Sequence, residues 1–254
     1  MNKYILLVIS LTLILGLSCS RTPININDNF ENKKLNKIWS TARIETNSYD
    51  FQSKIVRNGK RAIRITLKSG DIVEQQKGND NSTERDELLE ARELYAIEDI
   101  RYEYKFSMFL PDSFPIWPVR LVIAQWRQDC PFCSCSDYSP ILALRYVSGK
   151  LFITLQTDSV RQTLYELNEE IRNRWLDFCF EVKFSKQNNG EILVFLNGEK
   201  ILNYRGVTSY MDNCRILSQK NKYYFKMGLY RDRILNPMSI YIDDYSKKEL
   251  DEIK

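Results

Sequence analysis

Alternation of apolar and polar residues with a period of two recurs along this chain and restricts its fold more than any other feature. In residues 101–110, Tyr102, Tyr104 and Phe106 alternate with charged or small polar side chains until Pro111 ends the pattern. This alternation is typical of β-strands with one buried face, because successive side chains point to opposite sides of a sheet. The same pattern predicts further strands at residues 62–67, 141–146, 151–157, 176–184, 191–196, 200–204, 224–231 and 238–242.

Turn signals join neighbouring strands. Asn197-Gly198 is the strongest of them, because both residues tolerate the positive φ angles of a two-residue hairpin turn. Residues 86–95 and 164–174 are rich in Glu and Leu, but the surrounding strands argue against helices there. Residues 69–84 are polar and predict a long surface loop. Many short strands, with no internal repeat or composition break, predict one all-β domain: a sandwich or jelly roll in which one sheet forms a concave groove.

The N-terminus has the character of an export signal. Lys3 precedes an apolar segment at residues 5–17 that is short for a membrane span and suits a signal peptide. The sequence ending in Ser18 and Cys19 resembles a bacterial lipoprotein cleavage box, in which the cysteine is lipidated and anchors the protein to a membrane. We expect a signal peptide at 1–18, a tether at 19–27 and the folded domain at 28–254. The expected location is the outer membrane or cell surface as a lipoprotein, or the periplasm of a bacterium, with simple secretion as the alternative.

The chain contains 6 cysteines, and export would place them in an oxidising compartment. Cys130, Cys133 and Cys135 lie in one short run, whereas Cys179 and Cys214 lie far apart. With no histidine in the chain, this spacing does not match a four-ligand zinc site. We therefore expect a loop disulfide, at least one thiol that is free or pairs between chains, and no metal site.

The charges are nearly balanced, with 37 Lys and Arg against 33 Asp and Glu. This balance does not favour a nucleic-acid partner. We expect a monomer, and local basic clusters on its surface stay open.

One strand has an unusual polar face. In residues 224–230, Phe225, Met227 and Leu229 point to one side as a core face. Tyr224, Lys226, Gly228 and Tyr230 point to the other side, so that two phenols, an ammonium group and a bare backbone position share one surface. Such a face suits a groove for an anionic ligand, and a solvent-exposed strand is the simpler alternative.

This strand and two others resemble the signature motifs of the alginate-lyase and heparin-lyase-I-like polysaccharide lyases, which have a jelly-roll (concanavalin-like) fold. In that superfamily, Arg-x-Glu-Leu, Gln-x-His and Tyr-Phe-Lys-x-Gly-x-Tyr strands line one concave face. The matching segments here are residues 85–88, 125–127 and 224–230, in the same order. The resemblance spans residues 28–245 and implies an enzyme that cleaves a uronate-containing polysaccharide by β-elimination.

The resemblance also implies a role for each matching residue. β-Elimination removes H5 of a uronate and breaks the bond to O4, so the sugar carboxylate must be neutralised by donors. Arg85 and Gln125 suit that task, and Tyr230 matches the catalytic tyrosine. Lys226 and Arg127 are expected to bind substrate and to ease ionisation of Tyr230. Glu87 would hold Arg85 in position. Tyr224 and Arg145 are the remaining expected groove residues, and a solvated position is equally open for Arg145. No cofactor is required, and a structural calcium ion stays open.

One position departs from the family pattern. Arg127 stands where the family usually has a histidine that is associated with anti elimination, and no other histidine is available. The departure favours syn elimination, in which one tyrosine is both base and acid, or an inactive relative. A non-catalytic carbohydrate-binding protein on the same fold is the main alternative. A structural lipoprotein and a glycoside hydrolase are the others, and the hydrolase would need a carboxylate pair across the groove that no strand pattern indicates.

Overall fold

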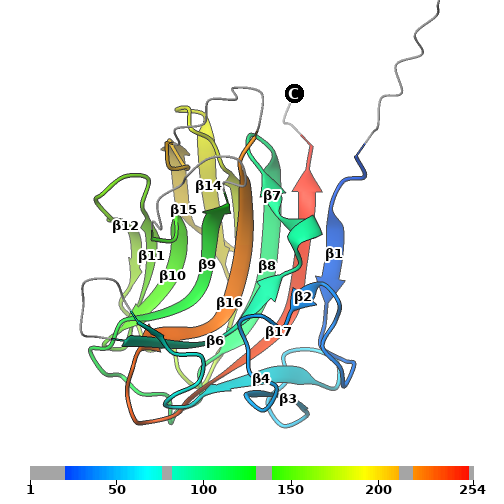
Figure 1. Cartoon of the computed structure of the whole chain (residues 1–254), viewed down its shortest axis with the longest axis vertical. Helices are drawn as coiled ribbons and strands as arrows, with labels where there is room; N and C mark the ends of the chain where they lie inside the picture. The colour runs from blue at the N-terminus through cyan, green and yellow to red at the C-terminus, as the bar shows by residue number, and fades with distance from the viewer. Residues whose placement is uncertain (1–20, 76–81, 130–138, 212–219, 252–254) are drawn as a thin grey trace, which may run out of the picture.

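The computed structural model describes residues 21–75, 82–129, 139–211 and 220–251, and its regular structure is almost entirely β-strand. The described strands form two antiparallel sheets, of 8 and 9 strands, that pack against each other (Figure 1). This arrangement confirms the predicted all-β sandwich. We call the sheet that contains the three motif strands the front sheet and the other one the back sheet.

The back sheet has the spatial order β15 (Glu199–Gly206), β14 (Gly190–Leu196), β13 (Trp175–Lys183), β8 (Arg101–Phe109), β17 (Met238–Leu250), β4 (Ala62–Leu67) and β3 (Tyr49–Gln52), with β1 (Asn25–Asp28) beside β17. The front sheet has the order β12 (Gln162–Leu167), β11 (Lys150–Leu155), β10 (Leu142–Val147), β9 (Leu121–Asp129), β16 (Lys222–Asp232), β6 (Ser82–Glu90) and β2 (Trp39–Ser40). Two short strands, β5 (Glu74–Gln75) and β7 (Ala96–Ile97), pair with β6 and β16. Figure 1 shows β10, β9 and β16 as neighbouring, strongly curved strands.

The core lies between the sheets and contains the predicted apolar faces. Phe225 of β16 packs against Trp126 of β9, with ring centroids 4.8 Å apart. It also contacts Tyr104 and Phe106 of β8 in the back sheet, at 5.3 and 6.0 Å. Met227 and Leu229 are fully buried on the same face, as the alternation predicts.

The structure corrects the prediction for one segment, and it agrees with the prediction that two Glu- and Leu-rich segments are not α-helices. Residues 69–84 are not a single surface loop, because β5 and the first residues of β6 pair within this range. Residues 86–95 form the end of β6 and one 3₁₀ turn, η1 (Arg92–Leu94), and no helix lies in residues 164–174. Residues of the expected tether at 19–27 take part in the back sheet, because β1 at Asn25–Asp28 pairs with β17.

Several predictions concern parts of the chain outside the described residues. The signal peptide, Cys19, Cys130, Cys133, Cys135 and Cys214 all lie there, so that lipidation and disulfide formation stay predictions. Cys179 lies within the described part of the chain and is a free thiol. Among the described residues, no helix has the length and apolarity to cross a membrane.

A buried ion pair joins the two sheets. Lys247 of β17 lies 2.9 Å from Glu90 of β6, between Nζ and Oε2, and both side chains are fully buried. The Tyr245 hydroxyl donates to the other oxygen of Glu90, and Lys247 Nζ lies 4.8 Å from the ring centroid of Tyr104. A buried pair of this kind is costly to break, because the remaining partner would keep an uncompensated charge away from water.

We expect Glu90→Gln to lower the free energy of unfolding by about 3–5 kcal/mol, because Lys247 loses its counter-charge inside the sandwich. Urea unfolding of the purified variant measures this change. Glu166→Gln is the matched control, because Glu166 pairs with Lys150 at the surface and such pairs contribute about 0–1 kcal/mol. Equal effects of the two substitutions would contradict a stabilising role for the buried pair.

Candidate active site

The register of the front sheet brings the three predicted motifs onto one face. Tyr230 lies directly opposite Arg85 of β6, and Lys226 lies directly opposite Gln125 of β9. Residues that face each other across neighbouring antiparallel strands point to the same side of the sheet. The motif residues, which are far apart in the sequence, therefore form one continuous polar surface.

Glu87 is at the centre of this surface. Its fully buried carboxylate accepts hydrogen bonds from Lys226 Nζ at 3.0 Å, from Arg85 Nη1 at 3.3 Å and from Gln125 Nε2. Burial by itself would raise the pKa of Glu87, but the positive charges of Lys226 and Arg85 hold it below its ordinary value. The arrangement fixes three side chains from three strands around one negative charge.

Lys226 is as deeply buried as its partner. Burial lowers its pKa to about 8, and the like charges of Arg85 and Arg127 add to the lowering, while Glu87 opposes it. The ammonium group is therefore a weakly solvated donor held in place by one carboxylate.

Tyr230 is half-buried beside two guanidinium groups. The guanidinium carbon of Arg85 lies 4.3 Å from the centre of its ring, and that of Arg120 lies at 5.8 Å. Both distances are in the range of cation–π contacts. Arg120 precedes β9 and was not predicted, because no pattern in the sequence marks this position.

Among the described residues, the cations in contact with the Tyr230 ring are not Arg127 and Lys226, which were expected to ease its ionisation. Arg127 lies opposite Tyr224, and six residues of extended strand, or roughly 20 Å, separate Tyr224 from Tyr230. Lys226 lies four residues from Tyr230 and is bound to Glu87. The cations beside Tyr230 are instead Arg85 and Arg120.

A backbone irregularity near Gly228 sets the position of Tyr230. The register between β16 and β9 shifts between Met227 and Tyr230, so that Tyr230 lies opposite Val122. Gly228 has a φ of +139°, and a Cβ at this position would collide with the carbonyl oxygen of Asp86. Only glycine allows β16 to approach β6 this closely while it bulges away from β9.

A cavity of about 310 Å³ adjoins the motif residues. The Tyr95 and Tyr224 rings pack 5.3 Å apart at its wall, and the carboxylate of Glu74 pairs with both Arg43 and Arg85. Its lining residues are Arg43, Glu74, Arg85, Leu89, Arg92, Tyr95, Arg127, Asp129, Tyr224 and Lys226. Arg43, Glu74, Arg92 and Tyr95 were not predicted, because they come from loops and very short elements that have no periodic pattern.

Arg145 of β10 belongs to the same face. It lies opposite Val122, which in turn lies opposite Tyr230. Its side chain is only 6% exposed, and its Nε donates to Thr154 Oγ1 at 3.0 Å. The open alternative of a solvated position is therefore wrong, because the guanidinium group is buried in the sheet.

Asp86 points to the opposite face of β6 and holds the loop that contains Arg43. Its Oδ1 accepts a hydrogen bond from the Glu45 amide at 2.8 Å, and the Glu87 amide donates to the Arg43 carbonyl at 2.7 Å. Burial raises the pKa of Asp86 to about 7. The adjacent Asp71 carboxyl adds to this rise, and the Glu45 amide opposes it.

The folded protein should retain a proton on Asp86 that the unfolded chain loses near pH 4. The folded state then binds more protons, and the free energy of unfolding falls as pH rises from about 4 to about 7. We expect Asp86→Asn, which has the shape of the neutral acid, to be more stable relative to the wild type at pH 8 than at pH 5. Urea unfolding at both pH values tests this, with exposed Asp112→Asn as the control. An equal change at both pH values would show that Asp86 does not titrate in this range.

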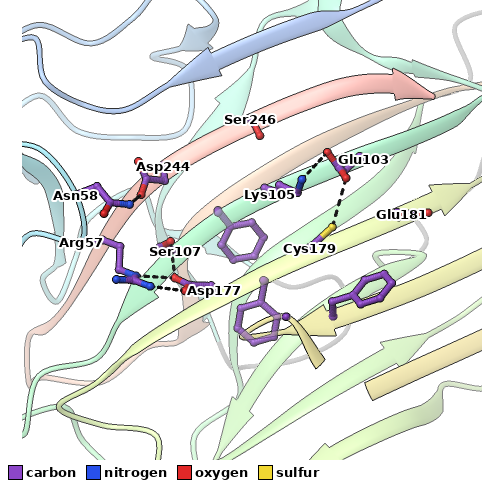
Figure 2. A pocket seen from close by; sticks show the side chains of 14 residues that line it. Arg57, Asn58, Glu103, Lys105, Ser107, Asp177, Cys179, Glu181, Asp244 and Ser246 are labelled. Atoms are coloured by element: carbon purple, nitrogen blue, oxygen red, sulfur yellow. Dashed lines mark hydrogen bonds and ion pairs between the residues drawn. The ribbon is translucent and has the colours of Figure 1, made fainter. Parts of the chain in front are cut away.

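A second pocket, of about 490 Å³, lies on the outer face of the back sheet (Figure 2). Its charged groups pair with one another: Arg57 with Asp177 at 2.7 Å, and Lys105 with Glu103 at 3.0 Å. Cys179 Sγ lies 3.7 Å from a Glu103 oxygen. Burial and the negative charge of Glu103 raise the pKa of this thiol to about 12. None of the predicted motif residues lines this pocket, which separates it from the candidate active site.

We expect Cys179 to resist alkylation, although it faces a pocket. A pKa of about 12 leaves roughly a thousandfold less thiolate at neutral pH than an ordinary cysteine has, and the thiolate is the reactive form. Iodoacetamide labelling followed by peptide mass spectrometry measures the rate in native protein and in denaturant. Labelling in native protein at the rate found in denaturant would contradict the expectation.

Comparison with known proteins identifies the class. The family model described as "Polysaccharide lyase" matches residues 28–246, so the chain belongs to this family of polysaccharide lyases. The match confirms the superfamily and the enzyme class that the three motifs predicted. No curated protein matches the chain by sequence.

Solved structures share the fold at low sequence identity. The endo-β-1,4-glucuronan lyase from the fungus Trichoderma reesei has a TM-score of 0.63 and 15% identity, over 84% of this chain and 92% of that chain. Alginate lyase AlgAT5 of polysaccharide lyase family 7 has a TM-score of 0.54 and 14% identity, over 82% and 84%. The cellulose-induced protein Cip1 has a TM-score of 0.56 and 11% identity, over 87% and 96%. These similarities confirm the predicted jelly-roll fold.

Proposed function

We propose that this polysaccharide lyase cleaves a uronate polymer by syn β-elimination, with Tyr230 as both base and acid. The observation that supports this most directly is the position of Tyr230, on the polar face of the front sheet with the guanidinium group of Arg85 over its ring. In a chain without histidine, this phenol is a proton-transfer group beside Arg85, one of the donors that would hold a sugar carboxylate.

Arg85 and Gln125 are the donors that would neutralise the substrate carboxylate. Glu87 binds both of them, which keeps the guanidinium and amide groups oriented before substrate arrives. The Nε of Arg85 is buried without a hydrogen-bond partner among the described residues. The carboxylate of Glu74, which is 40% exposed, pairs with Arg85 as a sugar carboxylate would, and the substrate would replace it.

In the proposed reaction, Tyr230 first accepts and then donates the transferred proton. The Tyr230 phenolate takes H5, the C5–H electron pair forms the C4=C5 double bond, and the C4–O4 bond breaks. Tyr230 then returns the proton to O4 of the leaving sugar. The guanidinium groups of Arg85 and Arg120 lie beside the ring, where they would offset the negative charge carried by Tyr230 in this mechanism. In glucuronate and mannuronate, H5 and O4 lie on one face of the sugar, which suits one residue acting twice.

Glucuronan is the first substrate to test, because the structurally similar Trichoderma reesei enzyme is a glucuronan lyase. Mannuronate-rich alginate has the same relation between H5 and O4, whereas guluronate-rich alginate has the opposite one. A syn mechanism therefore predicts cleavage of glucuronan or mannuronate-rich alginate and little cleavage of guluronate-rich alginate.

Tyr230→Phe should lower the turnover rate by about 100-fold or more, because general acid–base groups contribute that much. The ultraviolet absorbance of the unsaturated uronate product measures the rate. Tyr241→Phe is the control, because it removes a hydroxyl group from the back sheet. Full activity of Tyr230→Phe, or a preference for guluronate-rich alginate, would reject the mechanism. Binding of polymer by the wild type without product would favour the non-catalytic alternative.

A further inference from the structure

Arg145 is a buried positive charge without a negative partner in the described protein. Within residues 21–75, 82–129, 139–211 and 220–251, no carboxylate forms an ion pair with it, and its one hydrogen bond is to the Thr154 hydroxyl. The buried cations Lys226, Arg231 and Lys247, by contrast, each pair with a buried glutamate. Burying an unpaired charge is costly, so this arrangement needs a reason that the fold itself does not supply.

The neighbours of Arg145 increase this cost. Burial lowers the pKa of Arg145 to about 9, and the like charges of Arg161 and Arg120 lower it further, while the phenols of Tyr230 and Tyr210 act in the opposite direction. Arg161 is exposed just before β12, and Arg120 precedes β9 and pairs with Asp232 at 2.6 Å. Asp232 compensates Arg120, so the three guanidinium groups from three separate segments still leave a net positive charge at this end of the polar face, which suits an anion from solution.

This cluster lies across Tyr230 from Arg85. Arg85, Tyr230, Val122 and Arg145 form one cross-strand row through β6, β16, β9 and β10. Three strand spacings, or about 14 Å, separate the backbone positions of Arg85 and Arg145. A polymer that places one sugar between Arg85 and Tyr230 would extend its next sugars over Arg145 if it continued along this row.

We propose that Arg145 binds the carboxylate of a second uronate, next to the one that loses its proton, so that the enzyme acts on polymers with uronates at successive positions. The inference rests on the proposed function. A guanidinium group binds a planar carboxylate through two parallel hydrogen bonds, and the Nη groups are available for this because Thr154 uses Nε. Polymers in which uronates alternate with amino sugars would leave Arg145 without its partner.

Arg145→Met tests the inference, because methionine fills a similar volume without charge. We expect kcat/KM on the uronate polymer that the wild type cleaves to fall by about 10- to 100-fold, mainly through KM, because a charge-assisted bond is lost. Thermal stability should stay the same or rise, since an uncompensated buried charge is removed. Arg145→Lys keeps the positive charge but loses the planar guanidinium group, so its kcat/KM should lie between those of the wild type and Arg145→Met. Arg205→Gln removes an exposed charge from the back sheet and should change neither quantity.

Two further measurements separate the possible failures. Isothermal titration of Tyr230→Phe with a glucuronate tetrasaccharide should show binding that Tyr230→Phe/Arg145→Met loses, and partial methyl esterification of the polymer should slow the wild type more than Arg145→Met. Absence of product from every polymer with the wild type rejects the proposed function. Product formation with an unchanged KM in Arg145→Met overturns this inference alone. If inorganic phosphate binds the wild type but does not compete with the tetrasaccharide, the inference about Arg145 is overturned as well.

Discussion

The polar face of the front sheet depends on the buried carboxylate of Glu87. It binds Lys226, Arg85 and Gln125 from three adjacent strands, and none of these groups could be buried at low cost without it. The same contacts give Arg85 its place over Tyr230. A single negative charge thereby orients the donors of this face, and the surrounding strands exclude water from it.

The pairing of buried glutamates with buried cations extends along the whole of β6. Glu84, Glu87 and Glu90 pair respectively with Arg231, Lys226 and Lys247, so one strand supplies counter-charges to both faces of the sheet and to the back sheet. Nearly all of β6 is buried although its sequence is highly charged. Gly228 contributes in another way, because its positive φ lets β16 approach β6 and bulge away from β9 beside Tyr230.

Prediction from the sequence was good where one face of a strand is apolar and poor where both faces are polar. The alternation in residues 101–110 and 176–184 located β8 and β13, because burial of one face follows directly from the period of two. The start of β6 was assigned to a surface loop, because the cation that pairs with Glu84 is Arg231, 147 residues away in the sequence. Arg43, Tyr95 and Arg120 were missed for a related reason: they lie in loops or short elements, and only packing brings them to the site.

By itself, the sequence determined the all-β class, the core and polar faces of residues 224–230, and the set of chemical groups that a lyase needs. The class and the two faces follow from local periodicity, which does not depend on the rest of the chain, whereas the chemical groups follow from the resemblance of three motifs to the polysaccharide lyases. Only the tertiary structure decided which cations adjoin Tyr230, because register and the bulge at Gly228 place Arg85 and Arg120 there and leave Arg127 beside Tyr224. It also decided that Arg145 is buried, since the burial of a charged side chain depends on strands that the sequence does not place next to it.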